Sequence, residues 1–152
     1  MKKLKLVIAC STGGHLVEVK RLEDVYKNYD YTYFTFEGGV ANELAKTEKV
    51  VTIPNIHRQK PFTWIIGIWR SLIAVIKMRP DVIITTGAGV VVFYCIFARM
   101  LGAKLVFIES MARIELPTLT ARMLYPFSNL FIVQWPNLLK FIPKAKYLGR
   151  LL

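Results

Sequence analysis

Short apolar runs rich in β-branched residues alternate along this chain with segments long enough to form helices. This alternation constrains the fold most, because apolar strands separated by helices are typical of a parallel sheet that helices cover on both faces. The sequence therefore predicts a single α/β domain, residues 1–152, with a Rossmann-like, doubly wound sheet. The expected strands are residues 4–9, 31–36, 50–53, 81–85, 104–108 and 129–134.

The composition favours contact with a membrane surface. Hydrophobic residues make up 54% of the chain and mean hydropathy is +0.39. No uncharged apolar run reaches the roughly 18 residues that a spanning helix needs. The apolar run near the N-terminus is too short for a signal peptide. We therefore expect a cytoplasmic protein that lies on a membrane without crossing it.

Positive charge is concentrated in the later part of the chain. Residues 1–48 carry seven basic and seven acidic side chains, whereas residues 49–152 carry fourteen basic side chains and only three acids. This imbalance predicts an anionic partner for the later part. Nucleic acid, anionic lipid headgroups and a phosphorylated substrate all satisfy it, and charge alone does not choose among them.

Two glycine-containing turns follow expected strands, at the edge of the sheet where α/β domains bind ligands. Small residues at the start of a helix let backbone N–H groups approach an anion such as a diphosphate. The alternative is that the glycines only close tight turns. Neither turn has the full G-x-G-x-x-G pattern, which counts against NAD or FAD. The turns are Ser11-Thr12-Gly13-Gly14-His15 and Thr85-Thr86-Gly87-Ala88-Gly89.

His15 and Glu109 are the candidate reactive residues. His15 follows the glycines directly, where a neutral imidazole could take a proton from a sugar hydroxyl or donate a hydrogen bond to a phosphate; the alternative is a capping or surface histidine. Glu109 follows the strand expected at residues 104–108 and is one of only three acids in the basic region. It serves as a catalytic base, or it pairs with Arg113 four residues on if that segment is helical.

Cys10 and Cys95 each lie in an apolar run, which indicates two buried, reduced thiols. No cluster of His, Asp and Cys residues has the spacing of a metal site. We therefore expect a reaction that uses neither a metal nor a cofactor.

Residues 62–78 have a helical pattern with a broad apolar face, two tryptophans and a narrow stripe that carries Arg70 and Lys77. A helix of this kind suits the bilayer interface. A core helix of the domain and a spanning or re-entrant helix are the alternatives. Nucleic-acid binding is disfavoured, because the aromatic residues lie among aliphatic ones. The stripe also holds Thr63, Gly67 and Ser71.

Five motifs occur in order: STGGH at residues 11–15, TTGAG at 85–89, FIESMAR at 107–113, LFIVQWP at 130–136 and YLG at 147–149. Together they resemble the acceptor-side subunit family of the two-subunit glycosyltransferases of asparagine-linked glycosylation. Within that family the chain is most similar to the bacterial capsule and exopolysaccharide branch of PssD-like, glycosyltransferase-enhancer proteins. The resemblance covers essentially the whole chain.

The resemblance implies the N-terminal half of a GT-B glycosyltransferase, which binds a polyprenyl-diphosphate-linked sugar. A second polypeptide would supply the C-terminal half that binds the UDP-sugar, so the chain alone is expected to be inactive. Similarity to the peptidoglycan lipid-intermediate N-acetylglucosaminyltransferase makes His15 and Glu109 the leading catalytic candidates. The residues expected to bind the acceptor and its diphosphate are Ser11, Thr12, Gly13, Gly14, Thr86, Gly87, Gly89 and Arg113.

The chain departs from the eukaryotic members of the family in two places. Those members have an N-terminal membrane anchor, whereas here the first expected strand begins at residue 4, and the turn at residues 85–89 lacks their Asn and Pro. We therefore expect residues 62–78 to attach the protein peripherally to the cytoplasmic face of the cell membrane. The residues expected at this anionic surface are Arg58, Lys60, Trp64, Trp69, Arg70 and Lys77.

Trp135 and Phe141 are expected to contact the donor-binding partner, with a role in the core as the alternative. Two rival functions stay open. One is a non-catalytic membrane scaffold that recruits and stabilises the catalytic subunit. The other is a nucleotide-binding domain that is complete in itself.

Overall fold

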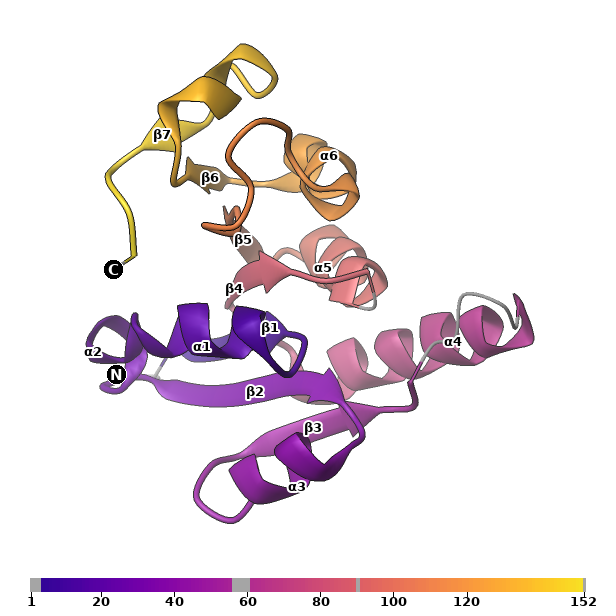
Figure 1. Ribbon diagram of the computed structural model, residues 1–152. Helices are drawn as coiled ribbons and strands as arrows, with labels where there is room; N and C mark the ends of the chain where they lie inside the picture. Colours follow the sequence, from indigo (N-terminus) through magenta and orange to yellow (C-terminus); the bar gives the residue numbers. More distant parts are fainter. Residues whose placement is uncertain (1–3, 56–60, 90, 152) are drawn as a thin grey trace.

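The computed structural model describes residues 4–55, 61–89 and 91–151. Within them the chain forms one parallel sheet in the order β3-β2-β1-β4-β5-β6-β7 (Figure 1). The predicted α/β class is confirmed, and each expected strand coincides with an observed one to within two residues. The strands are β1 (Lys5–Cys10), β2 (Asp30–Phe36), β3 (Val50–Ile53), β4 (Val82–Gly87), β5 (Lys104–Ile108), β6 (Leu130–Val133) and β7 (Lys146–Tyr147). The sequence did not predict β7, because its two residues are exposed and lack an apolar run.

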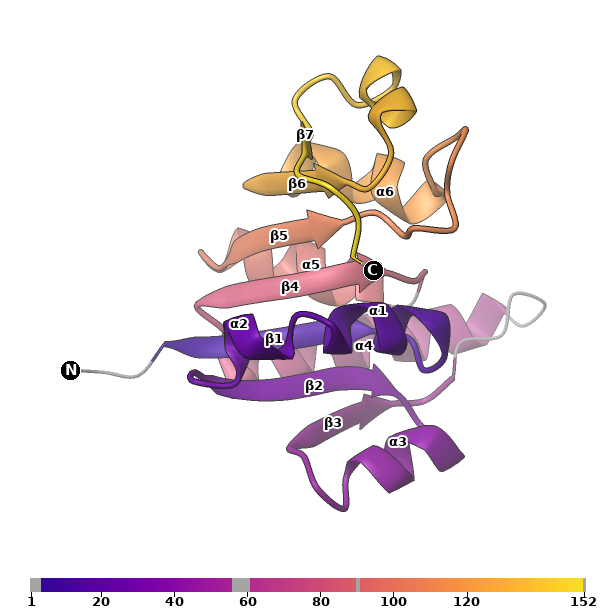
Figure 2. The ribbon, with the colours of Figure 1, turned by 60° about the vertical axis from the view of Figure 1, so that its left-hand side comes forward.

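Helices lie on both faces of the sheet (Figure 2). Alternate side chains of β1 explain why: Val7 and Ala9 join the core under the later helices, whereas Leu6 and Ile8 join the core under the first helices. On one face lie α1 (Gly14–Lys20), α2 (Glu23–Tyr26) and α3 (Gly39–Leu44). On the other lie α4 (Pro61–Met78), α5 (Val91–Met100) and α6 (Leu119–Leu124), with the 3-10 helices η1 (Tyr125–Phe127) and η2 (Pro136–Lys140) following α6 and β6.

Helix α4 packs against α5 along a row of small residues. Gly67, Ser71 and Ala74 are all buried, and they recur at the spacing that places side chains on one face of a helix. Gly67 and Ser71 were predicted to share the polar stripe of Arg70, and this prediction is wrong. Their small size suits close contact with α5, whereas Arg70 is exposed.

The strand order places β1 beside β4, and the helices that follow these two strands cover opposite faces. Such a position is the topological switch point, where the chain opens a crevice at the carboxyl ends of the strands. The register shifts here between Ala9 and Cys10, so that Cys10 pairs with Gly87. Both cysteines are free and buried, as the sequence predicted.

Candidate functional site

A cavity of about 640 Å³ opens at the carboxyl edge of the sheet, next to the switch point. We call it the carboxyl-edge cavity. It gathers residues from β2, from the end of β4 and the loop after it, from the segment between β5 and α6, and from four helices. Its lining consists of His15, Phe36, Trp64, Gly87, Ala88, Gly89, Val92, Phe93, Arg113, Thr118, Leu119, Thr120 and Met123.

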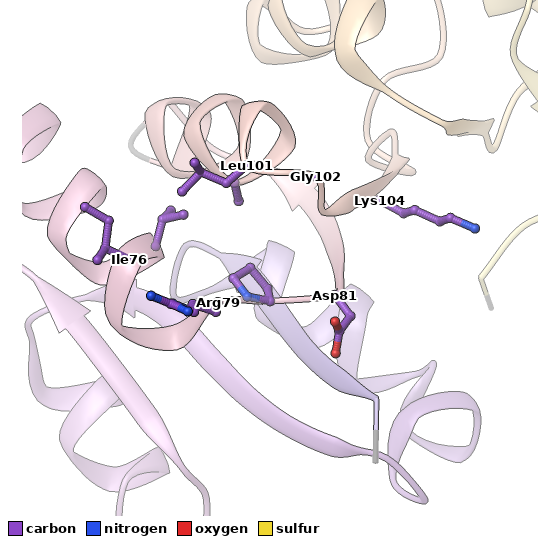
Figure 3. A pocket seen from close by; sticks show the side chains of 9 residues that line it. Ile76, Arg79, Asp81, Leu101, Gly102 and Lys104 are labelled. Carbon is purple, nitrogen blue, oxygen red and sulfur yellow. The ribbon is translucent and has the colours of Figure 1, made fainter. Parts of the chain in front are cut away.

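A second cavity, of about 530 Å³, lies where β4 and β5 begin (Figure 3). Arg79 and Lys104 line it, but their side chains extend in opposite directions and do not converge. The Asp81 carboxylate there accepts a hydrogen bond of 2.8 Å from the Lys5 backbone N–H. Since ligands of open parallel sheets bind at the carboxyl ends of the strands, we place the functional site in the carboxyl-edge cavity.

Contacts of both the backbone and the ring of His15 position this residue at the edge of the cavity. It follows Gly13, whose φ of 102° favours glycine. The Thr86 hydroxyl donates to the His15 carbonyl oxygen at 3.1 Å. The His15 ring lines the cavity, and its Nδ1 lies 3.8 Å from Oε2 of Glu18. The sequence therefore placed His15 correctly at the carboxyl edge of the sheet, while its role toward a ligand stays a prediction.

Glu18 is a buried carboxylate that the sequence analysis missed. One of its oxygens, Oε1, accepts hydrogen bonds from the Ser110 hydroxyl at 2.9 Å and the Met111 backbone N–H at 2.8 Å. These bonds tie α1 to the turn after β5. The available signal was an acid placed next to Val19 on the buried side of a short amphipathic helix.

Glu109 is fully buried at the end of β5, and both its oxygens accept hydrogen bonds. Ser110 N–H donates to Oε1 at 2.9 Å, and Thr118 N–H donates to Oε2 at 2.8 Å. The Thr118 hydroxyl lies within 3.2 Å of each oxygen. Burial raises the pKa of this carboxyl, while the bonds from Thr118 and Ser110 and the charge of Arg113 oppose the rise.

Two expectations for Glu109 change with this geometry. The ion pair with Arg113, the alternative that required a helical segment, does not form: residues 109–117 contain turns and bends and no helix, and within the described residues no ion pair joins the two side chains. Glu109 is also not among the residues that line the cavity. Its carboxylate instead fixes Thr118, the N-cap of α6, whose hydroxyl accepts from the Ala121 N–H.

The residues predicted to bind a diphosphate divide into three groups. Gly87, Gly89 and Arg113 line the cavity, and Arg113 is exposed. Thr86 is buried and supports His15 through the hydrogen bond from its hydroxyl to the His15 carbonyl oxygen. The remaining four form the turn between β1 and α1, outside the cavity lining: Ser11, Thr12, Gly13 and Gly14.

The two tryptophans of α4 occupy different positions. Trp64 lines the cavity and packs edge-on against Phe93, with ring centroids 6.2 Å apart. Trp69 is 63% exposed, beside the exposed Ile65 and Phe62. Arg70 and Lys77 are exposed as well, whereas Arg58 and Lys60 lie outside the described residues.

One side of α4 packs on the core, as the core alternative predicted, and the other side is exposed and apolar. A position at the bilayer interface stays a prediction. In the ranges that the structure covers, no helix is both long and apolar enough to cross a bilayer.

Trp135 supports the structure around the site. Its indole N–H donates to the Met111 carbonyl oxygen at 2.7 Å, and Arg150 lies over its ring at 4.7 Å. Gln134 beside it donates to the Glu109 carbonyl oxygen at 3.0 Å. Trp135 therefore has a structural role, while Phe141, 49% exposed, remains available to a partner.

Comparison with solved structures defines the class of fold. The chain superposes on MurG of Acinetobacter baumannii with a TM-score of 0.72 at 17% identity, covering 88% of this chain and 43% of that one. It superposes on UDP-GlcNAc 2-epimerase of Methanocaldococcus jannaschii with a TM-score of 0.73 at 13% identity, covering 97% and 46%. The domain therefore has the fold of the N-terminal half of GT-B enzymes and spans less than half of either chain.

Comparison of sequences defines the family. Residues 38–151 match the family described as "Oligosaccharide biosynthesis protein Alg14 like". The UDP-N-acetylglucosamine transferase subunit ALG14 of Rattus norvegicus is 30% identical, covering 99% of this chain and 84% of the relative. The corresponding subunit of Schizosaccharomyces pombe is 30% identical, covering 95% and 81%. The chain belongs to the Alg14-like family.

Proposed function

We propose that this chain is the acceptor-binding subunit of a two-subunit glycosyltransferase. It holds a polyprenyl-diphosphate-linked sugar, while a partner with the GT-B C-terminal half binds the UDP-sugar. The relatives named as UDP-N-acetylglucosamine transferase subunits support GlcNAc as the transferred sugar. The five sequence motifs favour a role in bacterial capsule or exopolysaccharide synthesis.

The observation that carries this proposal is the place of His15 in the carboxyl-edge cavity. A neutral imidazole there takes the proton of the acceptor hydroxyl as that oxygen attacks the sugar, and UDP leaves with the bonding electrons. Glu109 is the weaker candidate for this role, because its oxygens already accept bonds from Ser110 and Thr118.

The cavity also suits a diphosphate carried on a lipid. Arg113 supplies a positive charge, and the backbone at Gly87 and Gly89 allows close approach. Apolar residues surround this polar part: Trp64 on one side, and Leu119 and Met123 of α6 on the other. Leu119 is 65% exposed, so an apolar chain is able to leave the cavity along α6.

The exposed face of α4 supports peripheral attachment at the cytoplasmic face of the cell membrane. Phe62, Ile65 and Trp69 form an apolar surface with Arg70 and Lys77 exposed on the same helix. Apolar side chains with tryptophan and flanking cations are typical of helices at a bilayer interface. The excess of basic residues after residue 48 favours anionic lipids.

Co-sedimentation with phosphatidylglycerol vesicles tests this attachment. Ile65→Ser combined with Trp69→Ser should release most of the protein, and high salt should weaken binding by the unchanged chain. Val40→Ser is the matched control, because Val40 is 52% exposed on α3, on the other face of the sheet. Equal binding by all three proteins contradicts the role of α4.

Activity of the assembled pair tests the function itself. The chain alone should not transfer sugar from UDP-GlcNAc to a polyprenyl-diphosphate sugar, and adding the donor-binding partner should restore turnover. His15→Ala should lower kcat of the pair by about 10²- to 10⁴-fold, the usual contribution of a general base. Unchanged turnover by this variant supports a non-catalytic scaffold instead. Full turnover by the chain alone contradicts the two-subunit proposal.

A further inference from the structure

The two oxygens of Glu18 have different surroundings. Oε1 is occupied by the Ser110 hydroxyl and the Met111 N–H. Oε2 is buried and accepts no hydrogen bond. Nδ1 of His15 is likewise buried and without a hydrogen-bond partner, and it lies 3.8 Å from this oxygen. Two buried polar atoms that are both unsatisfied therefore lie beside each other, next to the carboxyl-edge cavity.

A proton on Nδ1 satisfies both atoms after a small rotation of either side chain. A neutral imidazole carries one proton, so an Nδ1–H that points to Glu18 leaves Nε2 as a free acceptor. The His15 side chain is 29% exposed while Nδ1 is buried. The open part of the ring is thus the side away from Nδ1, toward the cavity that His15 lines.

We propose that Glu18 is a positioning residue that selects the Nδ1–H tautomer of His15. Nε2 then faces the acceptor with its lone pair available. When the acceptor O–H bond breaks, the proton moves to Nε2, and the Glu18 carboxylate stabilises the resulting imidazolium. Through Oε1 the same carboxylate keeps the turn after β5 against α1. This inference rests on the proposed function only where it concerns the acceptor.

Glu18→Gln separates the two tasks of the side chain. The carbonyl oxygen of glutamine still accepts from Ser110 and Met111, which directs its amide group toward Nδ1 of His15. Two donors cannot share this contact, so His15 should move its proton to Nε2. Ser110→Ala is the matched control, because it removes a bond to Oε1 and leaves Oε2 unchanged.

Nitrogen-15 NMR of histidine-labelled protein reads the tautomer directly and needs neither partner nor substrate. The chain has two histidines, so a His57→Gln background leaves the His15 signals alone. At neutral pH we expect the proton on Nδ1 in this background and with Ser110→Ala, and on Nε2 with Glu18→Gln. A proton on Nε2 in the unchanged site overturns the inference even if Glu18→Gln fails to fold. An unchanged tautomer in a folded Glu18→Gln protein overturns it too.

Kinetics of the assembled pair separate this inference from the proposed function. Glu18→Gln should lower kcat at least about tenfold with little change in KM for the lipid-linked acceptor. Ser110→Ala should leave kcat within about threefold. If Glu18→Gln switches the tautomer but leaves kcat unchanged, the contact between Glu18 and His15 is upheld and His15 is overturned as the base. If Glu18→Gln does not switch the tautomer while His15→Ala causes a large loss of kcat, only the role of Glu18 is overturned.

Discussion

Helix α1 after β1 and the turn after β5 each carry a buried carboxylate close to the same cavity, but the two carboxylates are held differently. Glu109 after β5 accepts bonds at both oxygens and is closed to solvent. Glu18 after β1 has one satisfied oxygen and one that faces only His15. The comparison teaches that burial alone does not assign a role to a carboxylate. The number of donors already bound to each oxygen is the more informative quantity.

The largest effect on stability is expected from Glu109→Ala. This change leaves the Ser110 and Thr118 N–H groups without their acceptor, and a buried unsatisfied donor costs about 1–3 kcal/mol. We expect a loss of about 3 kcal/mol in the free energy of unfolding, measured by urea denaturation. Glu18→Ala should cost less, since it removes the acceptor of only one backbone N–H. The reverse order contradicts the assignment of Glu109 as the structural carboxylate.

The next effect is expected at Thr118, the residue that Glu109 holds. Thr118→Val keeps the shape but removes the hydroxyl that caps α6 through Ala121 and donates to Glu109. Loss of an N-cap costs roughly 0.5–2 kcal/mol, so we expect about 1.5 kcal/mol. Thr118→Ser retains the hydroxyl and serves as the control. Equal urea midpoints for the two variants argue against this cap.

The turn after β1 depends on glycine at one of its two positions. Gly13→Ala should cost about 1 kcal/mol, because Gly13 has a φ of 102°, which alanine rarely adopts. Gly14 begins α1 without a positive φ, and a Cβ there meets no atom within 4 Å. Gly14→Ala should therefore be neutral or slightly stabilising. Equal melting temperatures for the two variants contradict this difference.

The smallest expected effect is a pH dependence of the unfolding free energy that arises from Glu109 in the turn after β5. Burial raises the pKa of Glu109 above its ordinary value of 4.5, and hydrogen bonds from Thr118 and Ser110 partly offset the rise. Because the pKa of Glu109 is higher in the folded protein than in the unfolded chain, the protonated carboxyl contributes stability below pH 4.5. This contribution is lost as the pH rises through the pKa of the folded protein. The unfolding free energy of the wild type, minus that of Glu109→Gln, should therefore fall as the pH rises from 4.5. A difference that is flat or rises with pH contradicts the shift.

Local pattern was sufficient for the first six strands of the sheet and for the place of His15. A short apolar run such as residues 104–108 favours a buried strand, and its alternation with helical segments indicates a parallel sheet. The residue after a strand and its glycine turn must lie at the carboxyl edge, so His15 was correctly located. The same reasoning failed for Glu109 and Arg113, because whether residues 109–117 form a helix depends on bonds from Thr118 and Trp135 to that segment.

The sequence by itself determined the fold class, the ligand edge of the sheet and the family, because these follow from periodicity and short motifs. Only the tertiary structure decided which of these carboxylates has an oxygen without a hydrogen-bond partner and which tryptophan of α4 is exposed. Glu18 meets Ser110 across 92 positions of the chain. Trp64 likewise turns toward Phe93 of another helix, while Trp69 does not. Contacts between residues so far apart produce no periodic pattern in the sequence, since they depend on how separate elements pack once the sheet has formed.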